Sequence, residues 1–145
     1  MQSNDLKTFF QNLGLIALYS QCIECDLKKI YAGMANGDFQ INLGEVEEAT
    51  LGQTVSMLQA LDNEDNAPYF SAHDYDVLYA VNCRRNFWTH YLAREVVYLS
   101  GQEQLKKFAK LAKDLELDLE FFAGYRVYIE RVRFDVLKKY GVIKE

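Results

Sequence analysis

The stretch that decides the fold is DLKTFFQNLGLIALYSQCIECDLKKIYAGM, residues 5–34. Its apolar side chains recur at spacings of three and four residues, which is the period of one helix face and not of a strand. Ser3, Asn4 and Asp5 are good N-cap residues at its start. We therefore predict a long first helix from about Asp5 to Met34 that forms the main core. The apolar positions are Leu6, Phe9, Phe10, Leu13, Ile16, Ala17, Ile23, Leu27, Ile30, Tyr31 and Met34.

Turn signals divide the chain beyond this helix. Residues 36–38, Asn-Gly-Asp, carry turn chemistry, and the apolar residues of 39–43 alternate, so we predict a loop with a brief extended piece there. A second, amphipathic helix is predicted from about Thr50 to Leu61. The polar stretch 62–68 contains the only Pro and is the clearest loop of the chain.

Two further helical regions follow that loop. Ser71-Ala72-His73-Asp74 resembles a capping box and opens a region from about Ala72 to Leu99, with Asn82 as the position for a break or kink. Residues 102–140 predict one very long helix, or two that divide near Gly124. A helix near forty residues is long for this chain, so we expect its end to pack on a partner, most simply a second copy.

The predicted fold class is therefore all-α, an antiparallel bundle of four to five helices with a long C-terminal helix. The 145 residues indicate a single domain, 1–145. Half of the residues are hydrophobic and 14% are aromatic, so the chain has enough apolar surface to form a core. A chain of this size buries about 70% of its unfolded surface, so it needs no metal or disulfide to fold.

The charge and the apolar runs limit the possible partners and compartments. The net charge of −5 argues against broad nonspecific adhesion to nucleic acid, although a local basic cleft remains compatible with it. The sequence shows no signal peptide, and its longest apolar run is far shorter than a membrane span. We therefore expect a cytoplasmic protein without membrane association.

The three cysteines do not predict a metal site. Cys22 and Cys25 form a C-x-x-C pair inside the helical pattern of the first helix. A zinc site needs two more ligands at suitable spacing, and the remaining candidates, Cys83, His73 and His90, are scattered. We expect neither a metal nor any other cofactor.

The stretch CRRNFWTHY, residues 83–91, holds the candidate functional residues. Arginine, an amide and histidine together suit phosphate chemistry, because they offer a fixed positive charge, a neutral donor and a proton carrier. Each residue of an ideal helix turns about 100°, so Asn86 and His90 share a face, whereas Arg85 and His90 are about 140° apart. Arg85 and His90 can meet if the helix kinks at Arg85, or if two copies of the chain each supply half of a site.

The same residues also allow a purely structural interpretation. His90 can cap or pack, Arg84 and Arg85 can pair with acidic neighbours, and Trp88 can fill the core. We favour a core position for Trp88 over stacking on a base.

The chain resembles the HEPN domains, a helical family of prokaryotic defence and toxin–antitoxin systems with eukaryotic relatives. The specific part of the resemblance is Arg85-Asn86 followed by His90, which matches the short form of the family motif. Thr50-Leu51-Gly52-Gln53 sits where some branches have a similar helix start. Residues 23–30 are similar in character to the usual first helix.

The resemblance implies a metal-independent endoribonuclease that acts as a homodimer, with the Arg and His of both copies lining one cleft. His90 is then the base for the ribose 2′-hydroxyl or the acid for the 5′ leaving oxygen. Arg85 binds the phosphate, and Asn86 orients His90 or donates to the phosphate. Arg84 and Tyr91 are the candidate substrate-binding residues.

The resemblance further implies a toxin–antitoxin or phage-defence effector, with RNA as substrate and an antitoxin protein as partner. One branch of the family carries a Tyr two residues after the His, which a partner nucleotidyltransferase modifies. Here Tyr91 follows His90 directly and Leu92 takes the second place, so that regulation is not carried over. The alternative interpretation is a catalytically inactive HEPN-like module that dimerises and binds a nucleotide or a protein.

Overall fold

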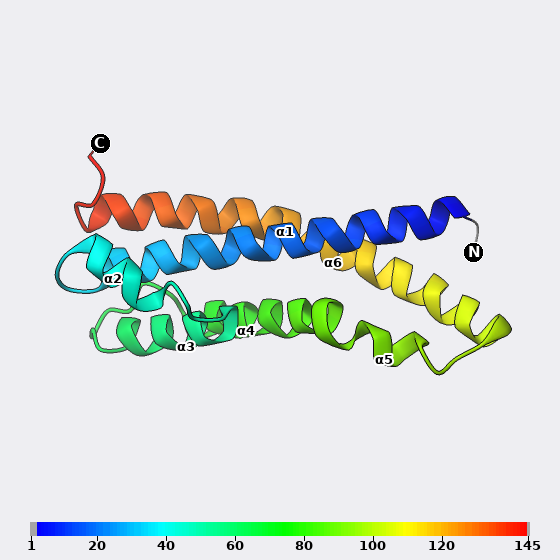
Figure 1. Ribbon diagram of the computed structural model, residues 1–145. Coiled ribbons are helices and arrows are strands. Elements are labelled where there is room, and N and C mark those ends of the chain that lie inside the picture. The colour runs from blue at the N-terminus through cyan, green and yellow to red at the C-terminus, as the bar shows by residue number, and fades with distance from the viewer. Residues whose placement is uncertain (1–2, 145) are drawn as a thin grey trace.

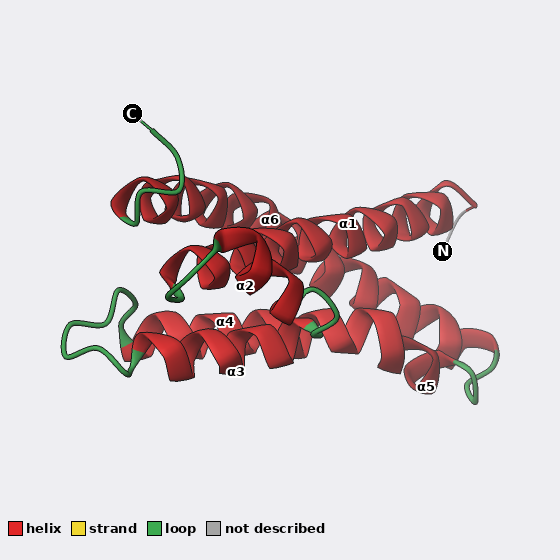
Figure 2. Ribbon diagram, turned by 60° about the vertical axis from the view of Figure 1, so that its left-hand side comes forward, coloured by secondary structure: helices red, strands yellow, loops and turns green. Residues whose placement is uncertain are grey.

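The structure is a computed structural model that describes residues 3–144, and within these residues the chain forms helices and no strand (Figure 1, Figure 2). The all-α fold class with a long C-terminal helix is thus confirmed. The elements are α1 (Ser3–Met34), α2 (Phe39–Val46), α3 (Leu51–Asp62), α4 (Ala72–Asn86), the π-helical segment η1 (Phe87–Tyr91), α5 (Leu92–Val96) and α6 (Gly101–Lys139).

The two longest helices, α1 and α6, lie side by side and run in the same direction (Figure 1). Near their starts the rings of Phe9 and Phe108 meet edge to face with centroids 5.8 Å apart. Near their ends Arg133 Nη1 lies 2.9 Å from Asp26 Oδ1. Helices α1 and α6 are therefore parallel, which is possible because α4 and α5 carry the chain back to the end of the molecule where α1 begins (Figure 1).

The α4–η1–α5 region runs antiparallel to α6. Arg84 of α4 pairs with Asp118 at 2.7 Å, and Glu95 of α5 pairs with Lys107 at 2.9 Å, so positions later in one region meet positions earlier in the other. The core lies between these layers and α3, and the apolar face predicted for the first helix supplies much of it. Its buried members include Phe9, Ile16, Ile23, Leu27, Ile30, Val55, Leu58, Leu78, Val81, Trp88, Leu115, Phe122, Ile129 and Val136.

Helix α6 is a single helix of 39 residues, about 58 Å long. Gly124 does not divide it, because this position faces open space and one glycine in a helix costs only about 1 kcal/mol. The C-terminal end packs on α1 of the same chain, where a Cβ at Gly33 would lie 2.7 Å from Leu137 Cδ2. The length of this helix therefore requires no second copy, contrary to our argument from the sequence. Gly141, at φ +74°, follows the last turn.

The loop predicted for residues 39–43 is wrong, since these residues begin the short helix α2. The Asp38 side chain caps the helix by accepting from the Ile41 backbone N–H at 3.1 Å. The buried Asn42 amide donates to the backbone carbonyls of Ala32, Ala35 and Asn36, at 3.1 to 3.3 Å. The apolar alternation was misleading because Ile41 is 66% exposed.

The third helical region is interrupted at a different place from the predicted one. Helix α4 continues through Asn82, and the irregularity is the π-helical turn at Phe87–Tyr91. The capping box predicted at Ser71 and Asp74 is present before α4, and the structure adds a second one before α3, where Thr50 and Gln53 bond reciprocally.

The loop between α3 and α4 is anchored by one buried carboxylate at the end of α3. Asp62 accepts from the Tyr69 N–H at 2.7 Å, the Phe70 N–H at 3.0 Å and the Tyr75 hydroxyl at 2.7 Å. Burial together with this bond to Asp62 raises the pKa of the Tyr75 hydroxyl well above its usual value. The Asp62 carboxylate thus joins the loop to both helices. No helix within residues 3–144 is long and apolar enough to cross a membrane.

Candidate functional site

The π-helical turn changes the geometry of the predicted motif. In an α-helix each N–H bonds to the carbonyl four residues back, and in a π-helix to the carbonyl five residues back. Residues five apart, such as Arg85 and His90, therefore lie closer to one face when part of the path between them is π-helical. The segment from Phe87 to Tyr91 covers most of that path, so the angle between the two side chains is smaller than the 140° of an α-helix.

Two contacts hold the π segment in place. The Thr89 hydroxyl donates to the backbone carbonyl of Arg85 at 2.8 Å, and such bonds from Thr to the carbonyl four residues back compete with the helix ladder and bend it. Trp88 is only 2% exposed and packs edge to face on Phe9 and Phe87. The core position favoured for Trp88 from the sequence is confirmed, so its ring is not available to stack on a base.

Arg84 is tied to the scaffold. Its Nε donates to Asp118 Oδ2 at 2.7 Å, and Nη2 lies 2.7 Å from the same oxygen. The Trp88 indole N–H also donates to this oxygen at 2.7 Å. The Arg84 guanidinium lies over the Phe87 ring, 5.0 Å from its centroid. The structural interpretation therefore holds for Arg84, and a role in substrate binding stays a prediction.

Arg85 is partly buried and has a different partner. Its Nη2 donates to Asn82 Oδ1 of the preceding turn at 3.3 Å. Its Nε is buried without a hydrogen-bond partner among the described residues. A buried donor in this state costs about 1–3 kcal/mol, so the guanidinium of Arg85 has hydrogen-bonding capacity that residues 3–144 do not use.

The other predicted site residues reach the surface on the same segment. His90 and Tyr91 are exposed, and Asn86, the last residue of α4, is partly buried. The Arg94 guanidinium lies over the Tyr91 ring at 4.3 Å from its centroid. Arg85, Asn86 and His90 thus lie on the continuous path of α4 and η1, and none of them is fully buried in the core.

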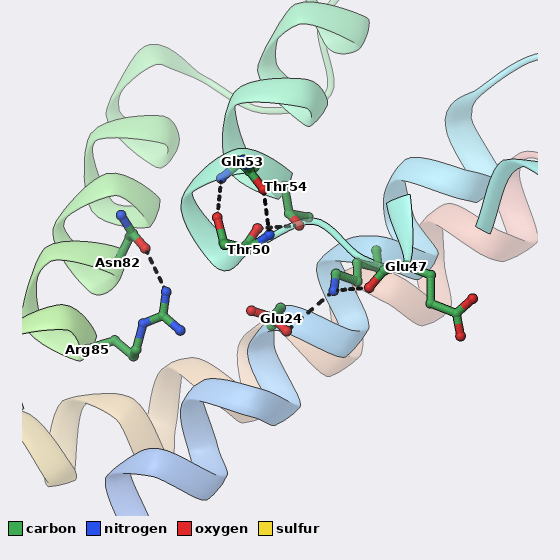
Figure 3. Close-up of polar contacts among 8 residues, drawn as sticks. Glu24, Glu47, Thr50, Gln53, Thr54, Asn82 and Arg85 are labelled. Atoms are coloured by element: carbon green, nitrogen blue, oxygen red, sulfur yellow. Dashed lines mark hydrogen bonds and ion pairs between the residues drawn. The ribbon is translucent and has the colours of Figure 1, made fainter. Parts of the chain in front are cut away.

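Sequence reasoning missed the contact between Asn82 and the start of α3. A Cβ built at Gly52 would lie 2.9 Å from Asn82 Nδ2 and 3.3 Å from Asn82 Cγ. Figure 3 shows Asn82 and Arg85 on α4 beside the capped first turn of α3, with Thr50 and Gln53 at its tip. Two signals for this contact were available in the sequence. Asn82 and Arg85 are three residues apart, which places them on one helix face, and a glycine lies in the first turn of the predicted helix that begins at Thr50.

The cysteines and acidic side chains do not gather into a metal site in the described part of the chain. Within residues 3–144 no group of three or more His, Cys, Asp or Glu side chains is arranged to hold a metal ion. Cys22, Cys25 and Cys83 are free thiols. Cys22 and Cys25 line a cavity of about 370 Å³ between α1 and α6, together with Arg126 and Arg133.

Comparison of the chain with family models, curated proteins and solved structures finds no significant match.

Proposed function

We propose that this protein is a metal-independent endoribonuclease of the HEPN type that cleaves RNA by attack of a ribose 2′-hydroxyl on the neighbouring phosphorus. The observation that carries the proposal is the π-helical turn at Phe87–Tyr91, because it reduces the angle between Arg85 and His90. Turns of this kind inside α-helices occur frequently at functional sites. His90 is exposed and Arg85 is only partly buried, so a phosphate can approach both.

In the proposed reaction His90 takes the proton of the 2′-hydroxyl, and the 2′-oxygen bonds to phosphorus while the bond from phosphorus to the 5′-oxygen breaks. The leaving 5′-oxygen receives a proton from the His90 of a second copy or from water. The products are a 2′,3′-cyclic phosphate and a 5′-hydroxyl. Arg85 donates to the non-bridging oxygens and stabilises the charge that develops on them. Asn86 orients His90 or donates to the phosphate. The substrate supplies the nucleophile, so the reaction needs no metal.

The proposal includes a homodimer, in which the π segments of two copies face each other across one cleft. Exposed apolar side chains beside the motif support this part of the proposal. Tyr91 is 43% exposed, Val97 is 60% exposed and Tyr98 is 90% exposed. Large apolar side chains that are exposed close together mark interaction surfaces.

The biological role that we propose is that of a toxin–antitoxin or phage-defence effector acting on cellular RNA, with an antitoxin protein as its partner. Induced expression in a bacterium tests this role directly. We expect growth arrest and fragmented total RNA for the wild type, and neither effect for Arg85→Ala or His90→Ala at equal soluble protein.

Cleavage by the purified protein tests the chemistry. RNA is incubated with the wild type in EDTA, and the product ends are analysed for a 5′-hydroxyl and a cyclic phosphate. Arg85→Ala and His90→Ala are expected to lose activity while their melting temperatures and oligomeric state stay unchanged. His73→Ala and Arg131→Ala are matched controls, since both residues are exposed and lie outside the motif.

One pattern of results would overturn the proposal. If the wild type leaves RNA intact in the cell and in the tube, or if His90→Ala cleaves as fast as the wild type, the ribonuclease assignment fails. Dimerisation or nucleotide binding without cleavage would then identify the inactive helical module.

A further inference from the structure

Arg85 is connected through Asn82, on the same helix, to Gly52 on α3, and neither of these two residues lies in the predicted motif. Arg85 makes its hydrogen bond to the Asn82 side-chain oxygen, at 3.3 Å. The other side of the Asn82 amide faces Gly52, at the start of α3. Asn82 therefore connects the guanidinium to the backbone of a second helix.

The fit between Gly52 and Asn82 leaves no room for a side chain. A Cβ at position 52 would lie 2.9 Å from Asn82 Nδ2, 3.3 Å from Cγ and 3.4 Å from Oδ1. The first of these distances is shorter than real Cβ contacts, so an added methyl group must displace the amide. The amide is the flexible end of a side chain, so it can shift without unfolding the protein.

The neighbouring residues of α3 fix Gly52 in this place. Thr50 accepts from the Gln53 N–H at 3.2 Å, while the Gln53 side chain accepts from the Thr50 N–H at 2.9 Å. Leu51 is buried in the core. The helix start is thus held by the capping box of Thr50 and Gln53 (Figure 3) and by an apolar anchor, and Gly52 lies against the Asn82 amide.

We propose that Gly52 and Asn82 are positioning residues that together set the conformation in which Arg85 meets the RNA phosphate. This inference rests on the proposed function. Neither residue touches the substrate. A donor that is pre-oriented for the charge of the transition state has nothing to reorganise during the reaction, and a misplacement of about 1 Å can cost on the order of 100-fold in rate.

Four variants test the pair: Gly52→Ala, Asn82→Ala, the double variant, and Gly124→Ala as the matched control. Gly124→Ala adds the same methyl group to a helical glycine with nothing within 4 Å. We expect Gly52→Ala and Asn82→Ala each to lower kcat by about 10- to 100-fold, with a smaller change in KM. The three heavy atoms nearest to the added methyl all belong to Asn82, so the double variant should match Asn82→Ala.

A spectroscopic readout separates this inference from the ribonuclease proposal. In protein with ¹⁵N-labelled arginine, the Arg85 Nε–H signal is assigned by its loss in Arg85→Lys. We expect this signal to move in Gly52→Ala and Asn82→Ala, to coincide in Asn82→Ala and the double variant, and to stay in place in Gly124→Ala.

An unmoved Arg85 signal in Gly52→Ala, or effects of the two substitutions that add in the double variant, would overturn the positioning role. If the signal moves as expected but the wild type does not cleave RNA, the contact is established and the proposed function fails. If the wild type cleaves RNA and Gly52→Ala cleaves equally fast, the proposed function stands and the positioning role fails.

Discussion

Replacing Asp118 with Ala is expected to remove about 2–3 kcal/mol from the free energy of unfolding. One carboxylate oxygen, Asp118 Oδ2, accepts from the Trp88 indole N–H at 2.7 Å and from Arg84 Nε at 2.7 Å. Trp88 is buried, so losing the acceptor leaves a buried donor unsatisfied, which costs about 1–3 kcal/mol. The Arg84 side chain is 42% exposed, so its ion pair adds about 0–1 kcal/mol.

The measurement is urea or thermal unfolding of the purified variant. For a chain of this size, each kcal/mol lowers the melting temperature by about 2–4 °C, so the expected loss for Asp118→Ala is about 4–12 °C. Asp118→Asn is the matched control, because its side-chain oxygen can still accept from Trp88. This variant should lose less than about 1 kcal/mol, the value of a partly exposed ion pair.

The double-variant test isolates the indole bond. Trp88→Phe removes the N–H donor, so in that background Asp118→Ala should cost only the ion pair with Arg84. Equal losses for Asp118→Ala and Asp118→Asn, or a loss in the Trp88→Phe background as large as in the wild type, would refute the assignment of the cost to the indole donor.

Three further predictions concern the rest of the scaffold. Gly33→Ala should lower the free energy of unfolding by about 1–3 kcal/mol, because the new methyl would overlap a buried leucine of α6. Gly124→Ala should instead raise it by up to about 1 kcal/mol. Urea unfolding compares the two variants. Asp62→Ala leaves three donors unsatisfied, two N–H groups of the α3–α4 loop and the Tyr75 hydroxyl of α4, and should lose about 3 kcal/mol or more in thermal unfolding. Asp65→Ala should change stability little, because Asp65 is exposed and accepts one bond. Burial raises the pKa of the Asp26 carboxyl above its usual value of 3.8, even though an arginine pairs with it. The contribution of Asp26 to the free energy of unfolding is therefore greatest below the usual pKa, and it is lost as the pH rises through the raised pKa of the folded protein. The free energy of unfolding of the wild type should therefore fall relative to that of Asp26→Asn as the pH rises from about 3 to about 7. A difference between the two proteins that does not change with pH would contradict this reasoning.

Much of the helical framework could be predicted because its signals are local. The apolar period of residues 5–34 corresponds to α1, and the capping residues Thr50 and Ser71 precede the two helices that were expected to start there. Caps and periodicity depend on residues within about one turn of each other, so they can be recognised without knowing the partner of a helix.

The errors arose where distant groups decide the local structure. Residues 39–46 are helical in part because the Asn42 amide bonds to carbonyls at the end of α1, and nothing near it in the sequence indicates those acceptors. The π-helical turn falls at Phe87–Tyr91, where Trp88 packs on Phe9 of α1, and not at Asn82. The first feature depends on acceptors beyond the range of one helical turn, and the second on packing between segments far apart in the chain.

At the candidate site, too, local features could be predicted from the sequence and contacts between helices could not. The sequence identified Arg85, Asn86 and His90 as candidates, because a motif of residue types can be read directly. It also indicated that Arg85 and His90 diverge on a regular helix, so that they can meet only through a kink or through a site shared by two copies. It did not reveal that Asn82 holds Arg85, or that Gly52 supports Asn82, because the contact with Gly52 joins two helices.

The sequence by itself determined the all-helical fold class, approximately where most helices begin and end, and a candidate stretch for phosphate chemistry, since periodicity, caps and residue types are local properties. Only the tertiary structure decided that α1 and α6 run parallel, that α2 is a helix and that η1 is π-helical. It also decided which arginine of the motif region forms an ion pair with another helix. These features depend on which side chains meet across the core, and that pairing is fixed by the packing of the whole chain.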